Sequence, residues 1–169
     1  MTSVALAAGW FIAGVFAWTL LEYVLHRFAG HVPKGKTKLS REHLAHHAKT
    51  DYFSPARGKL ALAVPVVGSV GLLLGPWFAS GLAAAWLGYE VVHRRVHTHG
   101  PLSGYSRWAS KHHLHHHFVS PNMNHGVSTP IWDWVFGTYE RPPKVLRVPR
   151  TQAARLPWLV EGTAGYQIA

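Results

Sequence analysis

Positive charge is absent from two long stretches of the 169-residue chain, and this distribution constrains the fold more than any other feature. All 17 lysines and arginines lie either between Arg27 and Lys59 or from Arg94 onward. The stretches without them are strongly apolar, as expected of segments that enter a lipid bilayer. The sequence therefore predicts an all-α integral membrane protein. Because the net charge of +10 reflects this segregation, we expect no nucleic-acid partner.

The two apolar stretches differ in form. Val4–Leu25 would be about 33 Å long as a helix, enough for one crossing, and its bulky aromatic residues argue against a cleavable signal peptide. The second stretch breaks at Gly75-Pro76, which predicts a helical hairpin with arms Leu60–Leu74 and Trp77–His97. Four glycines favour close helix packing in lipid, namely Gly68, Gly71, Gly81 and Gly88.

This arrangement predicts a topology. One crossing followed by a hairpin leaves all 14 histidines on the same side as every lysine and arginine. By the positive-inside rule that side is cytoplasmic. We therefore expect a cytoplasmic histidine-rich region above an inner, plasma or ER-like membrane.

Many of the histidines recur at helical spacing. Side chains at positions i, i+3 and i+4 of a helix share one face. Two triplets have this spacing, His43/His46/His47 and His113/His116/His117. A third, His112/His115/His116, overlaps the second, and spacing alone does not choose between them. Such faces are suited to holding metal ions with imidazole.

Two pairs extend the pattern. His93 and His97, four residues apart, share a helix face. His26 and His31 are rotated by about 500° on an α-helix, so they need a break near Gly30 to meet. Ten imidazoles exceed what one ion requires, and two ions with four or five nitrogens each fit better. Without cysteine, every ligand must be nitrogen or oxygen, and imidazole suits Fe, Zn, Cu and Ni.

Shorter elements are expected between and after these segments. Ser40–Thr50 and Ser110–Phe118 are predicted helices, the first with Ser40 as its N-cap. Trp132–Phe136 is an aromatic stretch typical of a membrane interface. Residues 1–140 would form the membrane-embedded domain, and 141–169 a basic, proline-rich tail that is extended or loosely packed.

The histidine motifs resemble those of the fatty acid hydroxylase/sterol desaturase superfamily of membrane di-metal oxygenases. The boxes of that family correspond to His26-x4-His31, His43-x2-His46-His47, His93-x3-His97 and His113-x2-His116-His117. Asn124-His125-Gly126 and Trp132–Thr138 are similar to its closing N-Y-G and W-D-x-x-F-G-T signatures, over about residues 20 to 140. The resemblance selects the His113 triplet. His125 stands where the family more often has an aromatic residue, so a ligand or substrate contact there stays open.

The resemblance implies oxygen activation at two irons, bound by these ten histidines, and attack on a C–H bond of a lipid such as an acyl chain or sterol. A carotenoid hydroxylase or a desaturase of the same chemistry is the nearest alternative. Zinc can replace iron in an all-histidine site. The chain has no G-x-G-x-x-G motif and no spare length for a flavin or haem domain, so electrons would come from a separate redox protein. The basic face could dock it.

Polar residues near the histidines could orient the imidazoles. The candidates are Glu22, Glu42, Glu90, Asn124, His125 and Asp133. Glu22 and Glu90 could instead be helix-end residues, and Asp133 a helix-start residue.

Two functions outside oxygenation remain open. A membrane metal transporter would need ionisable residues along its path, and the hairpin region 60–89 has no charged residue. A zinc hydrolase would want a carboxylate base, and the H-E-x-x-H motif is absent, although Glu42-His43 leaves some room.

Overall fold

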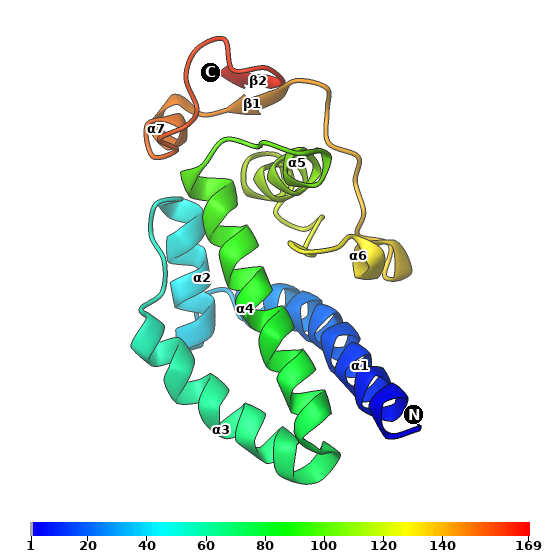
Figure 1. The fold of residues 1–169 in the computed structure, drawn as a ribbon. Coiled ribbons are helices and arrows are strands. Elements are labelled where there is room, and N and C mark those ends of the chain that lie inside the picture. Colours follow the sequence, from blue (N-terminus) through cyan, green and yellow to red (C-terminus); the bar gives the residue numbers. More distant parts are fainter. Residues whose placement is uncertain (1) are drawn as a thin grey trace.

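Three long helices form the lower part of the molecule, and the shorter elements gather beside and above their upper ends (Figure 1). The computed structural model describes residues 2–169. The long helices are α1 (Thr2–Val24), α3 (Ala56–Leu74) and α4 (Pro76–Thr98). Helices α3 and α4 turn at Gly75, whose φ of 90° suits glycine, and so form the expected hairpin. The first arm begins four residues earlier than predicted, and the second agrees with its predicted bounds to within one residue at each end.

Helix α4 packs along α1 at very short range. A methyl group built on Gly14 would lie 2.1 Å from the carbonyl oxygen of Phe78, and one on Gly81 would lie 2.0 Å from that of Phe11. Only glycine allows two helix backbones to approach this closely. Of the four glycines singled out from the sequence, Gly81 has this role, whereas Gly68 and Gly88 face open space.

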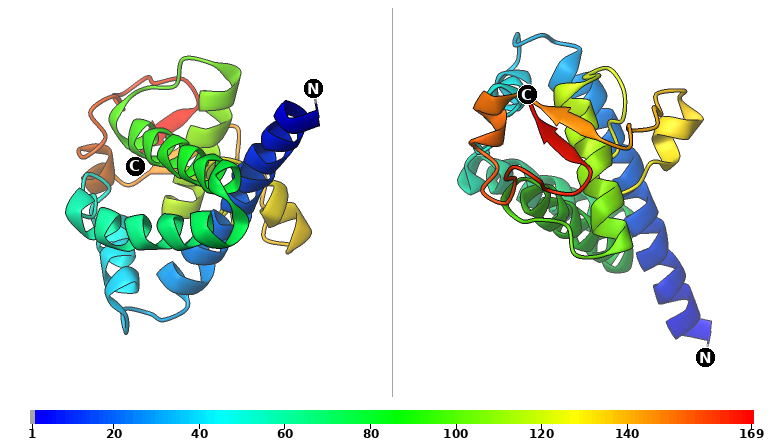
Figure 2. Two further views of the ribbon diagram at one scale, coloured as in Figure 1. Left: turned by 60° about the horizontal axis from the view of Figure 1, so that its bottom comes forward. Right: turned by 90° about the horizontal axis from the view of Figure 1, so that it is seen from above.

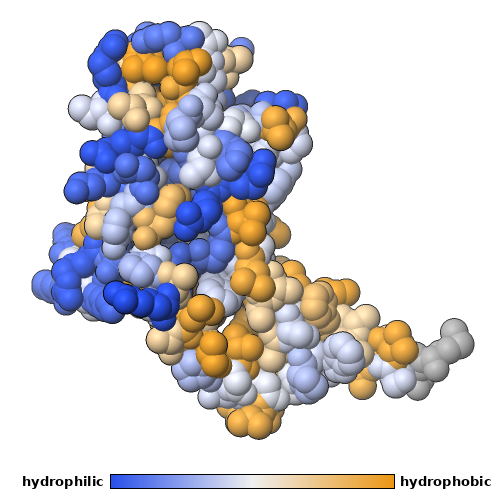
Figure 3. Space-filling model, turned by 60° about the vertical axis from the view of Figure 1, so that its left-hand side comes forward, coloured by the Kyte–Doolittle hydropathy of each residue, from blue (hydrophilic) through white to orange (hydrophobic). Residues whose placement is uncertain are grey.

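Within residues 2–169, two helices are long and apolar enough to cross a membrane, Ser3–His31 and Ala56–Leu74. Their outer surfaces are rich in exposed leucine, valine and phenylalanine. Figure 3 shows this as hydrophobic colour over the lower part and along the protruding N-terminal helix, with hydrophilic residues above. A mostly helical fold with two candidate membrane-spanning helices is therefore confirmed, while the topology and its sidedness stay a prediction.

The connection from α1 to the polar region continues as a π-helix, η1 (Leu25–His31), before helix α2 (Lys38–Ala48). The predicted cap of α2 is wrong, because Thr37 caps the helix by accepting a bond from the Ser40 amide. The Ser40 hydroxyl instead donates to the Gly30 carbonyl at 2.6 Å. This bond ties α2 to η1, so the two elements that carry the first histidines are held together.

Helix α5 (Gly104–Phe118) begins six residues earlier than the sequence predicted. Ser103 accepts a bond from the Ser106 amide, and the Ser106 hydroxyl accepts one from the Ser103 amide, which makes a capping box. The nearby glycines and Pro101 concealed this start. The earlier beginning gives α5 four turns on which to place its histidines.

The C-terminal residues fold back over α5, and the expectation of a loosely packed tail is wrong (Figures 1 and 2). Strands β1 (Leu146–Val148) and β2 (Tyr166–Ile168) pair in parallel, with the short helix α7 (Arg150–Ala153) following β1. Leu146, Val148 and Leu156 are buried against α5 and the end of α4. The fold is thus mostly helical rather than all-α. Strands of three residues are too short to give a readable alternation.

Candidate metal centre

Ten imidazoles converge where the long helices meet the polar region, and they form two groups. In each group one ring nitrogen per residue lies within 4.8 Å of all the others. The first group contains His26, His31, His43, His47 and His116. The second contains His46, His93, His97, His113 and His117. All ten histidines singled out from the sequence are therefore brought together, five to a group.

Each histidine triplet contributes to both groups. On α2, His43 and His47 point to the first group and His46 to the second; on α5, His116 joins the first group and its neighbours His113 and His117 the second. Adjacent residues on a helix are separated by about 100°, so one helix can face two sites at once. His47 and His117 stack at 4.1 Å where the groups adjoin.

The π-helix explains how His26 and His31 meet without a break. Its backbone bonds span five residues, so residues five apart lie on nearly the same side. The two rings are 5.5 Å apart and stacked. Gly30, read from the sequence as a helix breaker, lies inside this element, and a methyl group there would be 2.9 Å from the His43 ring. Glycine at this position lets α2 approach.

Main-chain carbonyls fix the orientation of three imidazoles. The Nδ1–H groups of His26, His46 and His116 donate to the carbonyl oxygens of His125, Tyr52 and Met123 at 2.5, 2.7 and 2.7 Å. A carbonyl oxygen can only accept, so the proton of each neutral ring is on Nδ1. Each Nε2 therefore carries no proton, and its lone pair points into the group to which the histidine belongs.

These lone pairs face one another at distances that only a cation would make favourable. Nε2 of His26 and Nε2 of His116 are 2.9 Å apart, and neither carries a proton to share. His31 and His47 bring their Nε2 atoms to 3.0 and 3.1 Å from the same His116 atom. Nitrogens bound at about 2.1 Å from one ion, at right angles, are about 3 Å apart. The donor set thus fits a metal ion in each group.

Burial keeps the imidazoles that α2 and α5 turn into the two groups neutral at physiological pH. Loss of hydration lowers the pKa of His46 to about 4, and loss of hydration with the neighbouring His31 lowers that of His43 to about 2. Burial among other histidines holds the pKa values of His113, His116 and His117 well below the usual range. Neutral imidazole is the form that binds metals, so protons compete weakly for these sites.

Three of the predicted carboxylates form other contacts. Glu22 accepts bonds from the Val127 and Ser128 amides at 2.6 and 2.9 Å, so it holds a loop rather than an imidazole. Glu90 pairs with Lys59 at 2.6 Å, and Glu42 accepts a bond from the Tyr52 hydroxyl. Among the described residues none of the three bonds to a histidine ring. Glu42 nevertheless contacts the site indirectly, because it holds Tyr52, whose carbonyl oxygen accepts the hydrogen bond from His46.

Asp133 is fully buried and organises the loop next to the first group. Its Oδ1 accepts bonds from the His125 amide and the Thr138 hydroxyl, both at 2.8 Å, and its Oδ2 from the Gly126 amide at 2.8 Å. His112 lies 3.2 Å from Oδ2. Burial opposes ionisation, but these bonds outweigh it and keep the pKa of Asp133 below its usual value. Asp133 thereby positions His26 indirectly, through the His125 carbonyl.

His112 therefore points away from the two groups, as the resemblance implied. Asn124 closes the same loop, with its side chain bonded to both the amide and the carbonyl of Glu140 at 2.8 Å. His125 lies against the first group, with ring centres 5.2 Å from His116 and 5.5 Å from His26. Its ring belongs to neither set of five.

Sequence reasoning missed the main-chain part of the site. The carbonyls of Tyr52, Met123 and His125 orient three ligand candidates, but every residue has a carbonyl, so no residue type signals this role. No residue type indicated the π-helix either. The spacing His26-x4-His31, which fits no α-helical face, was the one available hint of it.

The fold and the site together define a class of helical membrane protein with a polyhistidine centre at the end of its long helices. A family model described as fatty acid hydroxylase matches residues 11–138. The chain belongs to this family, within the fatty acid hydroxylase/sterol desaturase superfamily.

Individual relatives agree with this assignment. The chain is 33% identical to the ceramide very long chain fatty acid hydroxylase SCS7 of Saccharomyces cerevisiae, covering 78% of this chain and 38% of the relative. It is 31% identical to dihydroceramide fatty acyl 2-hydroxylase FAH2 of Arabidopsis thaliana, covering 74% and 58%. It is 32% identical to human fatty acid 2-hydroxylase, covering 77% and 39%. The chain thus spans between about two fifths and three fifths of these relatives' length.

A solved structure has the same fold. It is that of full-length scs7p, in which only the hydroxylase domain is visible. The two superpose with a TM-score of 0.68 at 33% identity, covering 82% of this chain and 58% of the other.

Proposed function

We propose that this protein is a membrane-bound di-iron hydroxylase that converts a C–H bond of a lipid acyl chain to C–OH. One atom of O2 enters the bond and the other leaves as water, while two electrons and two protons are consumed. The named relatives are fatty acid and ceramide 2-hydroxylases, which favours the carbon next to the acyl carbonyl over a sterol or carotenoid position. They likewise favour hydroxylation over metal transport or hydrolysis.

The observation that carries this proposal is the pair of five-imidazole groups with facing lone pairs. The ligands of one iron would be His26, His31, His43, His47 and His116, and those of the other His46, His93, His97, His113 and His117. Activation of O2 for attack on an unactivated C–H bond is the chemistry that two irons in such a site supply when bound. Because all ten candidate ligands are neutral imidazoles, the protein would add no negative charge to the ions that they would hold.

The protein residues have three tasks in this reaction. The carbonyls of Tyr52, Met123 and His125 set the tautomers, so that Nε2 is available without rearrangement. The loop clamped by Glu22 and Asp133 holds the His125 carbonyl in place. The C-terminal segment covers α5 and keeps bulk water from its side of the histidines, a requirement for reactions that pass through oxidising species.

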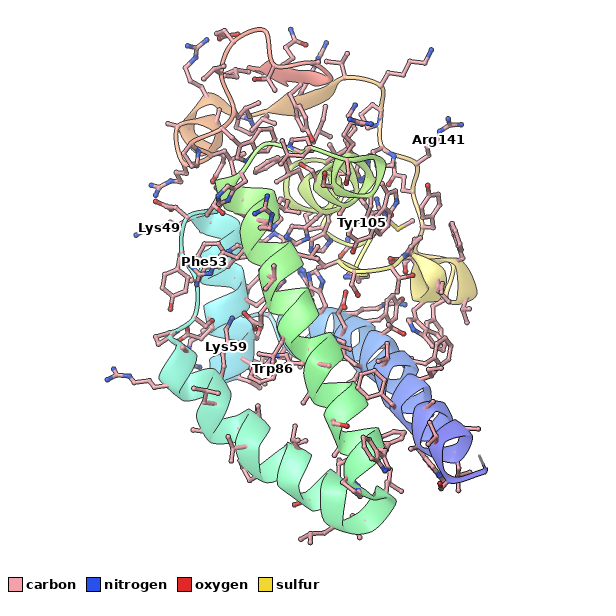
Figure 4. All side chains as sticks on the ribbon, viewed as in Figure 1. Lys49, Phe53, Lys59, Trp86, Tyr105 and Arg141 are labelled. Atoms are coloured by element: carbon pink, nitrogen blue, oxygen red, sulfur yellow. The ribbon has the colours of Figure 1, made fainter. Side chains whose placement is uncertain are left out.

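Electrons would come from a separate redox protein on the cytoplasmic side. The distribution of lysine and arginine supports this sidedness, since all 17 lie on the segments outside the apolar stretches. Exposed basic residues above the histidines, such as Lys49 in Figure 4, would attract an acidic partner.

Lipid mass spectrometry with labelled oxygen gas tests the proposal. Cells that produce the protein should contain a hydroxylated acyl lipid, heavier by one labelled oxygen atom and absent from cells without the gene. Labelling from water instead of O2 would refute oxygenation, and an unchanged lipid profile under conditions of full metal loading would refute the lipid substrate.

A matched pair of histidine variants tests the ligand assignment. His116→Ala removes the nitrogen that faces three others and should abolish both activity and binding of one metal ion. His99→Ala changes an exposed residue outside both groups and should leave both intact. Equal loss in the two variants, with both still folded by circular dichroism, would contradict the assignment.

A further inference from the structure

Helix α6 (Ile131–Val135) and the residue after it, Phe136, form an apolar face that the rest of the described chain leaves partly exposed. Four large side chains make up this face, with exposed fractions of 39% for Ile131, 58% for Trp134, 61% for Val135 and 49% for Phe136. The inner side of the helix is fully engaged through the four contacts of Asp133. A firmly held helix with a contiguous apolar outer face is typical of a contact surface rather than of an incomplete core.

The depth of α6 follows from its contacts with α1. The Trp132 indole N–H donates to the Thr19 hydroxyl at 2.9 Å, and its ring lies 5.3 Å from that of Phe16. Phe136 stacks on Tyr23 at 5.1 Å. Thr19 and Phe16 belong to the candidate membrane-spanning helix Ser3–His31. In both views of Figure 2, α6 lies at the edge of the molecule beside α1.

The lipid-facing surface of α1 therefore continues onto α6. Phe16 is 51% exposed next to Trp132, so acyl chains that surround α1 at this level also meet the outer face of α6. Basic residues follow just above this level. The Arg27 guanidinium lies 5.1 Å from the Phe28 ring, and Arg141, labelled in Figure 4, extends outward above α6. Aromatic side chains with basic residues above them match the polarity of the headgroup layer.

We propose that α6 lies in the interfacial layer of the bilayer, with Trp134, Val135 and Phe136 in contact with phospholipid. This attachment is additional to the spanning helices and is made by a segment too short to cross the membrane. Its occupant is lipid rather than a protein, because the face is continuous with the surface that a spanning helix presents to lipid. The proposal is independent of the reaction that the metal centre performs.

The chain contains no cysteine, so single cysteines can carry a spin label without any background substitution. We would label Val135→Cys on α6, Val160→Cys in the C-terminal segment and Leu72→Cys on the hairpin, where the native residues are 61%, 63% and 91% exposed. Valines 135 and 160 are thus matched in type and exposure. The full chain is reconstituted into vesicles of phosphatidylcholine and phosphatidylglycerol, and relaxation by O2 and by a water-soluble nickel chelate is compared.

The label at 135 should be relaxed strongly by O2 and weakly by the nickel chelate, as we expect for the label at 72. Its ratio of relaxation by O2 to relaxation by nickel should be several-fold higher than the ratio at 160. A ratio equal to that at 160 would place α6 in water and overturn the proposal. Weak relaxation by both agents, with spin–spin broadening between chains, would mean that a second copy covers α6 and would also overturn it. Ile131→Cys, on the same face, repeats the test if the first variant does not fold.

Discussion

Asp133→Asn is the most informative single substitution, because it keeps the shape of the side chain and removes its charge. The two carboxylate oxygens accept bonds from two main-chain amides, one on each oxygen, belonging to His125 and Gly126. Whichever oxygen becomes the NH2 group, one of these buried N–H groups faces a donor. The Thr138 hydroxyl can adapt by rotation and the His112 ring by a change of tautomer, but a main-chain N–H group can only donate.

The expected cost follows from these contacts. A stranded buried donor costs about 1–3 kcal/mol, and the remaining bonds lose about 1 kcal/mol when the acceptor is no longer charged. The total of about 2–4 kcal/mol corresponds to a fall in the unfolding midpoint of about 4–16 °C. Because the loop also holds the acceptor of His26, metal affinity in the first group should fall about 10–100-fold.

Thermal unfolding of the purified protein in detergent, followed by tryptophan fluorescence, measures the first effect, and titration of the metal-free protein with iron or zinc measures the second. Asp51→Asn is the control, since it weakens an exposed pair with Arg155 and should cost less than about 1 kcal/mol. If Asp133→Asn has the same unfolding midpoint and the same metal affinity as Asp51→Asn, the proposed path from Asp133 to His26 is refuted.

Three further results are expected. Gly30→Ala should displace the His43 ring and weaken metal binding about tenfold in a titration, whereas Gly9→Ala, which meets nothing within 4 Å, should not. Gly81→Ala should force α4 away from α1 and lower the yield of folded protein, whereas Gly88→Ala on the same helix should be neutral or stabilising by up to about 1 kcal/mol. Wild-type yield in the first variant would refute close packing. The metal-free protein should lose stability as the pH falls below about 6.5, because unfolded histidines then take up protons while His43, with a folded pKa of about 2, does not. Each such group contributes up to about 1.4 kcal/mol per pH unit, and a flat denaturation profile between pH 7 and 5 would contradict this.

The membrane helices and the histidine faces could be predicted because both depend on periodic or uninterrupted patterns. An apolar run such as Val4–Leu25 identifies a helix whatever it packs against, and α1 agrees with it to within a few residues. The triplet spacing likewise fixes which rings share a face, so His113 and His117 could be expected to meet. Neither inference needs knowledge of the partner element.

The features that could not be predicted depend on tertiary contacts. Leu146 and Leu156 become a core only because α5 offers them an apolar surface, and in the sequence they lie among prolines and arginines. Glu22 was expected near an imidazole since it precedes His26 by four residues, but its partners are amides more than one hundred residues away. No local signal distinguishes these two outcomes.

The division of each histidine triplet between the two groups has a consequence for loading. Helices α2 and α5 are shared scaffolds, so an ion that draws His47 and His116 into position also fixes the backbones that carry His46 and His117. If each group binds an ion, the first ion would therefore order part of the site that the second requires, and thermodynamic linkage would make this effect reciprocal. Binding of the two ions would then be positively cooperative.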